Sequence, residues 1–204
     1  MALPSIEAVT FDASEMKAMT EENTIQVHVW LTVENDILTL NYFPIAPDIP
    51  SNFKDMGLLQ DGYRKMISSE SALIEAEAVK VDGCQALWLI LRKNLEPHGT
   101  IYLASLTMPF RDFSFVAKVQ CDERGITGMR ESMASADIAM KKDGLDERWN
   151  FRERWIDDIY DSRLHEGRLR NVSDDEKYDS KLPNHPLSRA PHVSSFTFDD
   201  RSGR

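Results

Sequence analysis

The sequence predicts an α+β fold, in which an antiparallel β-sheet of about six strands is covered by amphipathic helices and followed by a charged C-terminal extension. Two observations support this prediction. Residues 71–121 read as consecutive strand patterns joined by short turns, and short connections favour antiparallel pairing because parallel strands need a long crossover. Apolar side chains recur at three- and four-residue steps before and after this stretch, which predicts a helix on either side of it.

The first predicted elements form a hairpin near the N-terminus. Apolar and polar side chains alternate strictly along residues 25–33, which predicts a half-buried strand. Its expected buried face consists of Ile25, Val27, Val29, Leu31 and Val33, and its opposite face of Gln26, His28, Trp30 and Thr32. Residues 34–36 are typical of a turn, and residues 37–43 form the second strand. Upstream, residues 9–11 are compatible with a short edge strand.

A helix is predicted over residues 53–67, after an extended linker that contains three prolines. Ser51 or Asn52 can cap this helix, because a short polar side chain accepts a hydrogen bond from a first-turn amide. Asp55 and Asp61 lie mainly off the apolar stripe of the helix. The stripe itself consists of Phe53, Met56, Leu59, Tyr63, Met66 and Ile67.

The central strand of the sheet is predicted at residues 86–91, because a run that is apolar at every position is typical of a strand covered on both faces. The Asp82-Gly83 pair before it predicts a two-residue hairpin turn, since glycine accepts a positive φ without a Cβ penalty. In the preceding strand the apolar alternation changes phase, and a β-bulge near Ala78 would account for the change. Residues 113–121 alternate cleanly and form the last strand.

A second helix is predicted over residues 127–142, with a methionine stripe made of Met129, Met133 and Met140. Core packing is the favoured explanation of this stripe, and an adaptable binding groove is the alternative. Residues 141–182 carry 12 acidic and 10 basic side chains, a density of charge that is difficult to bury. The sequence therefore predicts an α+β sandwich domain at residues 1–142 and a charged, partly helical arm and tail at residues 143–204.

The charged arm also contains tryptophan, tyrosine and arginine, which is the composition of interface hot spots. The candidate partner-binding residues are Trp149, Arg152, Trp155 and Tyr160 in the arm, with Asp55 and Asp61 in the first helix. The alternative is that the arm is clamped over the open face or edge of the chain's own sheet. A capping-box pattern from Ser173 predicts a brief helix, and prolines and serines from Asn184 onward predict a tail without regular structure.

Charge and composition limit the possible partners. Residues 1–80 carry 13 acidic and 5 basic side chains, so most of the net charge of −10 lies in this part. An acidic surface disfavours nucleic acid and anionic membranes and favours a basic protein partner, although solubility alone would also explain it. No window approaches the roughly 18 apolar residues of a membrane span, and the N-terminus has no basic or apolar leader, so we expect a cytoplasmic protein.

Recognisable catalytic motifs are absent from the sequence, which has no phosphate loop, dinucleotide fingerprint, nucleophile elbow or zincin helix. The five histidines show no helical pairing and the two cysteines form no Cys-x-x-Cys pair, so no metal, cofactor or catalytic residue is predicted. An enzyme of unrecognised type would use His98 or His165 with surrounding carboxylates.

The order of the predicted elements resembles the PsbP-like and DcrB-like α/β/α sandwich superfamily. The likeness covers residues 25–142 and rests on the hairpin of residues 25–43, the helix of residues 53–67, the Asp82-Gly83 turn and the strand of residues 113–121. The resemblance implies a non-enzymatic module that binds a protein partner, as do photosystem accessory subunits, nuclear transport factors and bacterial chaperones for secreted effectors.

Three hypotheses of function remain open at this point. The first is an adaptor, a chaperone for a secreted effector or a toxin-neutralising immunity protein, which holds another protein through an acidic or aromatic surface without chemistry. The second is an enzyme that uses one of the two histidines named above. The third is a structural subunit of a larger assembly.

Overall fold

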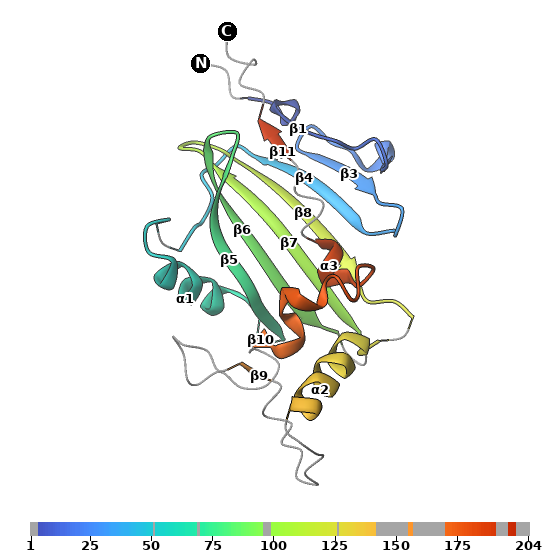
Figure 1. The fold of residues 1–204 in the computed structure, drawn as a ribbon. Helices are drawn as coiled ribbons and strands as arrows, with labels where there is room; N and C mark the ends of the chain where they lie inside the picture. The colour runs from blue at the N-terminus through green and yellow to red at the C-terminus, as the bar shows by residue number, and fades with distance from the viewer. Residues whose placement is uncertain are drawn as a thin grey trace.

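The computed structural model describes residues 4–50, 52–68, 70–95, 99–125, 127–141, 155–156, 170–190 and 196–198. A seven-stranded antiparallel sheet forms the centre of the described fold (Figure 1). Its strands lie in the order β2 (Lys17–Ala18), β3 (Val27–Leu31), β4 (Ile37–Phe43), β8 (Ser114–Asp122), β7 (Thr100–Pro109), β6 (Cys84–Asn94) and β5 (Ser71–Val81). The predicted α+β fold with an antiparallel sheet is therefore confirmed.

Strands β5 to β8 form the predicted meander, in which each strand pairs antiparallel with the next along the chain. The turn between β5 and β6 is Asp82-Gly83, where φ is 49° and 81°. A positive φ at both central residues is what a type I′ hairpin requires, and an Asp-Gly pair adopts it with little strain. The predicted hairpin is confirmed.

The phase change in β5 comes from a β-bulge that lies earlier than predicted. Leu73 and Glu75 pair with consecutive residues of β6, so Ile74 is the extra residue. The predicted position near Ala78 is wrong, because the pairing is regular from Glu75 to Val81.

β6 is covered on both faces, as its apolar sequence predicts, but it is not the central strand. Ala86 and Ile90 belong to one core cluster, and Leu87 and Leu89 belong to another. β6 is second from the edge of the sheet, and β8 lies in the middle. The reason is that β4 pairs with β8 and so adds the N-terminal hairpin to the far side of the meander.

The two core clusters define the two faces of the sheet. On the front face, side chains of β4, β6, β7 and β8 pack against Leu187 and Ala190 of the C-terminal segment. On the back face, α1 (Met56–Met66) packs against β5 and β6 and buries Leu59 beside Leu73 and Leu87. In Figure 1 the C-terminal segment crosses one face of the sheet, and α1 lies beside β5.

The face of β3 that contains Trp30 packs against the core, although the alternation pattern predicted that this face would be exposed to solvent. Trp30 packs against the front-face cluster, opposite Leu38 of β4. Ile25 and Val33, which were expected on the buried face, are 87% and 75% exposed and lie beyond the ends of the strand. An indole buries more apolar area than a valine, so packing of Trp30 decides which face is buried.

α1 is capped by Asp55, whose carboxylate accepts a hydrogen bond from the amide of Leu58 at 3.0 Å. The prediction of Asn52 as the cap is wrong, because its side chain accepts from the amide of Lys54 before the helix begins. Ser51, the other predicted cap, lies outside the described residues.

α2 (Met129–Lys141) turns a polar face inward. Arg130 is fully buried, and Ala134 is 2% exposed. Met129 and Met140 are 44% and 74% exposed, so core packing is the wrong explanation of the methionine stripe. The helix turns this way because Arg130 finds its hydrogen-bond acceptors in the C-terminal segment.

Residues 170–190, called the C-terminal segment here, form β10 (Arg170–Asn171), two 3₁₀ turns (Val172–Asp174 and Glu176–Tyr178) and α3 (Pro186–Arg189). The brief helix predicted from Ser173 is thus a pair of 3₁₀ turns, and its capping box is formed by Asn171 with Asp174. The tail without regular structure predicted from Asn184 is wrong as far as residue 190, since α3 is helical and buries Leu187.

Two short pairings complete the described fold. β1 (Val9–Phe11) pairs with β11 (Phe196–Phe198), so the strand expected at residues 9–11 exists but does not join the edge of the main sheet. β9 (Trp155–Ile156) pairs with β10. The division of the chain at residue 142 stays a prediction. In the ranges that the structure describes, no helix is long and apolar enough to cross a membrane.

Candidate functional site

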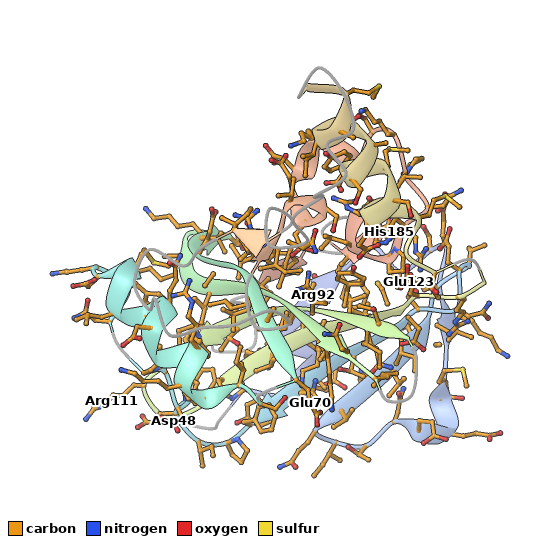
Figure 2. All side chains as sticks on the ribbon, turned by 90° about the horizontal axis from the view of Figure 1, so that it is seen from below. Asp48, Glu70, Arg92, Arg111, Glu123 and His185 are labelled. Atoms are coloured by element: carbon orange, nitrogen blue, oxygen red, sulfur yellow. The ribbon has the colours of Figure 1, made fainter. Side chains whose placement is uncertain are left out.

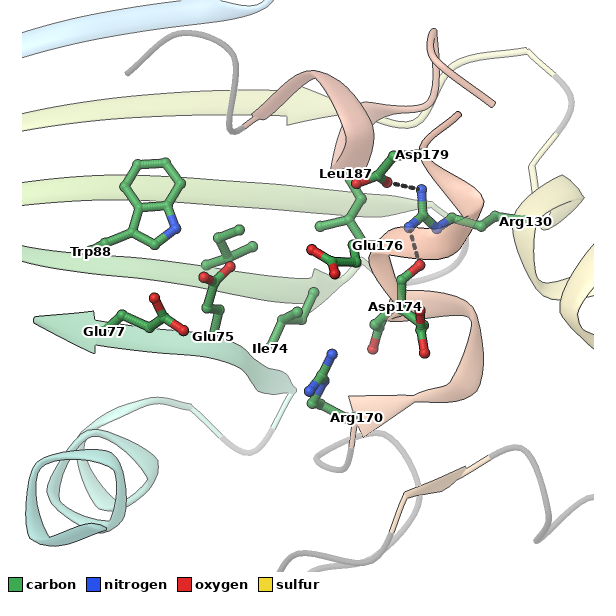
Figure 3. A pocket seen from close by; sticks show the side chains of 12 residues that line it. Ile74, Glu75, Glu77, Trp88, Arg130, Arg170, Asp174, Glu176, Asp179 and Leu187 are labelled. Carbon is green, nitrogen blue, oxygen red and sulfur yellow. Dashed lines mark hydrogen bonds and ion pairs between the residues drawn. The ribbon is translucent and has the colours of Figure 1, made fainter. Parts of the chain in front are cut away.

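A cavity of about 500 Å³ opens on the front face where β5 and β6 meet the C-terminal segment (Figure 3). This volume is within the range of small-ligand sites, roughly 300–1,000 Å³. The lining residues are Ile74, Glu75, Glu77, Trp88, Ile90, Arg130, Arg170, Asp174, Asp175, Glu176, Asp179 and Leu187. Six of these side chains are acidic and two are basic, so the cavity carries a net negative charge. The other four, Ile74, Trp88, Ile90 and Leu187, form its apolar part.

The β-bulge in β5 brings a carboxylate into this cavity. Leu73, just before the bulge, belongs to the back-face cluster, whereas Ile74 and Glu75 both line the front cavity. A bulge commonly re-aims a side chain in this way. Glu75 therefore lies on the front face beside Glu77 and the indole of Trp88, as Figure 3 shows.

Glu75 is the carboxyl group whose ionisation the cavity opposes. Burial raises the pKa of Glu75 above its ordinary value of 4.5, and the like charge of Glu77 raises it further. The nearby indole of Trp88 and the positive charge of Arg170 favour the ionised carboxylate and act against this rise. Repulsion from Glu176 adds a last small contribution in the raising direction. Glu75 is thus a partly desolvated carboxylate that would gain from a positive neighbour.

Asp174 forms the deep end of the cavity, and its side chain has no exposed area. Its Oδ2 accepts hydrogen bonds from Nη1 of Arg92 and from the amide of Asn171, both at 2.7 Å. Burial raises the pKa of Asp174, and the Arg92 guanidinium acts against that rise. Its Oδ1 is buried and has no hydrogen-bond partner within the described residues. A buried carboxylate oxygen without a donor is costly, so a donor that reached this atom would stabilise the site.

Arg130 holds the C-terminal segment in place through hydrogen bonds from all three of its guanidinium nitrogens. Its Nη1 donates to Oδ1 of Asp179 and to Oγ of Ser188, both at 2.7 Å. Its Nη2 donates to the carbonyl of Asp175 at 2.9 Å, and its Nε donates to the carbonyl of Ser173. Because each nitrogen of this guanidinium donates to the C-terminal segment, Arg130 builds the cavity wall and forms no ion pair with the glutamates.

The remaining negative charge of the cavity is on three glutamates, and Arg170 is the basic side chain of the described lining that acts on Glu75. Within the described ranges, Glu75, Glu77 and Glu176 form no ion pair with a basic side chain, whereas Asp174 and Asp179 are paired with arginines. No group of three or more His, Cys, Asp or Glu side chains in the same ranges is arranged to hold a metal ion. The arrangement suits an organic cation, which carries its own hydrogen-bond donors and an apolar stem.

The lining offers little for catalysis. A carboxyl group with a raised pKa can act as a general acid, which in the described lining would apply to Glu75 and to Asp174, and Asp174 is paired with Arg92. Among the described residues of the lining, none is a Ser, Cys, His, Lys or Tyr that could serve as nucleophile or base.

The residues predicted as contacts from the sequence do not line this cavity. Asp55 caps α1, and Asp61 pairs with Lys65 at 2.5 Å on the surface of the same helix. The backbone of Trp155 lies in β9. The remaining predicted residues, Trp149, Arg152 and Tyr160, lie outside the described residues, as do His98 and His165.

No sequence pattern indicated that His185 is buried and caps α3. Nδ1 of His185 accepts the amide of Leu187 at 3.2 Å, and Nε2 lies 3.8 Å from Oε1 of Glu123 (labelled in Figure 2). Burial, aided by the charges of Arg130 and Arg189, lowers the pKa of His185 to about 4. His185 is therefore neutral near pH 7 and serves the packing of α3.

Comparisons with known proteins do not assign the chain to a family. No family model matches it, and no curated protein does. Among solved structures, the Saccharomyces cerevisiae Ran-binding protein Mog1p is 10% identical with a TM-score of 0.48, over 96% of this chain and 92% of that one. A mutant of protein Mog1 is 10% identical with a TM-score of 0.46, over 99% and 98%. The resemblance to the PsbP-like and DcrB-like superfamily stays a prediction.

Proposed function

We propose that the protein is a non-enzymatic protein-binding module that receives a basic segment of a protein partner in the front-face cavity. The observation that supports this proposal is the set of glutamates around Trp88, which form no ion pair within the described residues although Arg170 lines the same cavity. A basic side chain of a partner would supply the missing charge to Glu75 and reduce the energetic cost of burying it.

The charge of the chain supports the same kind of partner. The net charge is −10, so long-range attraction would favour a basic protein over an acidic one. An adaptor, a chaperone for a secreted effector and a toxin-neutralising immunity protein would each need such a surface. The identity of the partner decides among these three roles.

The proposal is tested by affinity capture from native lysate with three forms of the protein. These are the wild type, the Glu75→Gln/Glu77→Gln variant, and a Glu21→Gln/Glu22→Gln control that removes the same charge from an exposed 3₁₀ turn. We expect one stoichiometric basic protein with the wild type and the control, and its loss with the cavity variant. Equal capture by all three forms would place the partner elsewhere and contradict the proposal.

A further inference from the structure

We propose that the cavity recognises a guanidinium group, so that one arginine side chain of the partner lies against Trp88 and reaches the carboxylates behind it. This inference rests on the proposed function, since it names the side chain through which a basic partner would bind. Three independent features of the site support arginine over lysine.

The first feature is the distribution of open acceptors. Oδ1 of Asp174 is buried without a donor, and the carboxylates of Glu75, Glu77 and Glu176 line the same cavity. A guanidinium presents five N–H donors in a rigid plane, whereas an ammonium presents three around one point and is more strongly hydrated. Several acceptors around one desolvated space therefore suit the guanidinium better.

The second feature is how this protein pairs its own buried carboxylates. The aspartates with the least exposed ion pairs all bind arginine: Asp174 with Arg92, Asp179 with Arg130 and Asp36 with Arg189, each at 2.7 Å. The lysines that form ion pairs in the described residues are 47–65% exposed, whereas these three arginines are 1–18% exposed. The lysine pairs are Lys65 with Asp61, Lys177 with Asp175 and Lys181 with Asp137. The least exposed basic partners of carboxylates in the described part of this protein are therefore guanidinium groups, which suits the partly buried carboxylates of the cavity.

The third feature is the indole. Trp88 is partly buried against the front-face cluster and lines the cavity next to Glu75 and Glu77 (Figure 3). A guanidinium stacks on an aromatic face while its edge donates to carboxylates, and an ammonium cannot do both in one plane. Ile74 and Leu187 supply apolar surface for the aliphatic stem of the same side chain.

The test uses three acetylated and amidated pentapeptides that differ only in the central residue, which is arginine, lysine or citrulline. The readout is NMR of the full-length protein, because Trp88 lines the cavity beside Glu75 and the signal of its indole N–H reports on the cavity. The chain has four tryptophans, and Trp88→Phe identifies the signal. We expect the arginine peptide to shift this signal with a Kd about tenfold lower than that of the lysine peptide. The uncharged citrulline peptide should cause no shift.

The controls separate this inference from the proposed function. Glu75→Gln should weaken binding of the arginine peptide about tenfold, whereas Glu21→Gln, at an exposed position, should leave it unchanged. A thermal melt shows that each variant is folded. A lysine peptide that binds as tightly as the arginine peptide, or an arginine peptide that does not bind, would overturn the guanidinium assignment. The capture experiment decides the proposed function separately, because it does not depend on which basic side chain enters the cavity.

The source of the guanidinium is tested with ethylguanidinium as a probe. Because the cavity is larger than one side chain, we expect the peptide to bind more tightly than this small cation. Equal affinities would overturn the assignment to a partner's arginine and indicate a site for a free guanidinium compound.

Discussion

At the scale of single residues, Glu75 is a carboxylate whose position costs stability. Its side chain is drawn into the cavity by the bulge, and burial together with Glu77 raises its pKa above 4.5. A raised carboxyl pKa means that the unfolded chain ionises more readily than the folded one. Glu75 therefore opposes folding at neutral pH, which makes it a candidate for a residue kept for binding.

Replacing Glu75 with glutamine should stabilise the protein at pH 7. The amide keeps the shape of the side chain but removes the charge whose burial is unfavourable. The cost in the wild type is present above the raised pKa and disappears as the pH falls below 4.5, so the two proteins should converge there. Thermal melts at pH 7 and at mildly acidic pH measure this, with Glu21→Gln as control. A lower melting temperature for Glu75→Gln at pH 7 would contradict the stated role of burial.

Arg130 is the opposite case, a buried charge whose three nitrogens all have acceptors. Arg130→Met should lower the free energy of unfolding by about 3–5 kcal/mol, because the carbonyl groups of Ser173 and Asp175 lose their donor and Asp179 loses its charged partner. Urea denaturation measures the loss. The matched control is Arg111→Met on a side chain that is 94% exposed, where we expect a change within about 0.5 kcal/mol.

At the scale of elements, Asp55 can be interpreted either as a residue that contacts a partner or as the cap of a helix. From the sequence it is an acidic contact residue, and in the structure its carboxylate caps α1. Asp55→Ala should lower stability by about 1 kcal/mol, whereas Asp55→Ser should keep most of it because serine also caps. Chemical denaturation of both variants distinguishes capping from docking. Equal losses in the two variants would show that the cap contributes nothing.

The elements that sequence patterns predicted well are those set by local chemistry. The Asp82-Gly83 hairpin follows from the φ values that only a few residue pairs accept. The two-sided burial of β6 follows from its unbroken apolar run. By contrast, the inward faces of β3 and α2 depend on tertiary packing, of Trp30 against the front-face cluster and of Arg130 against the C-terminal segment. No local pattern contains that information.

The candidate site could not be predicted for the same reason. Its carboxylates come from β5 and from the C-terminal segment, nearly a hundred residues apart in the sequence. Glu75 and Glu77 read as a solvated strand face, and only the bulge at Ile74 and the crossing of the C-terminal segment make them part of a cavity. The predicted preference for a basic partner needed only the net charge, so it could be made without knowing the site.

At the scale of the whole molecule, the C-terminal segment belongs to the same packed core as the sheet. Leu187 is 4% exposed and lies in the front-face cluster. Arg189 ties α3 to the turn between β3 and β4 by donating to both carboxylate oxygens of Asp36, at 2.8 and 2.7 Å. The C-terminal segment forms one wall of the cavity, and the contacts that hold this wall in place are the same ones that pack the segment against the sheet.

This arrangement predicts that the sheet and the C-terminal segment unfold together. Leu187→Ala should lower the free energy of unfolding by about 2–5 kcal/mol, the usual cost of a cavity in a core. The matched control is Leu58→Ala, at a side chain that is 60% exposed, with an expected change within about 0.5 kcal/mol. Hydrogen exchange should show amides of β7 and of residues 170–190 losing protection by the same factor, since one cooperative unit opens as a whole. Loss of protection in the segment alone would instead support a division of the chain at residue 142.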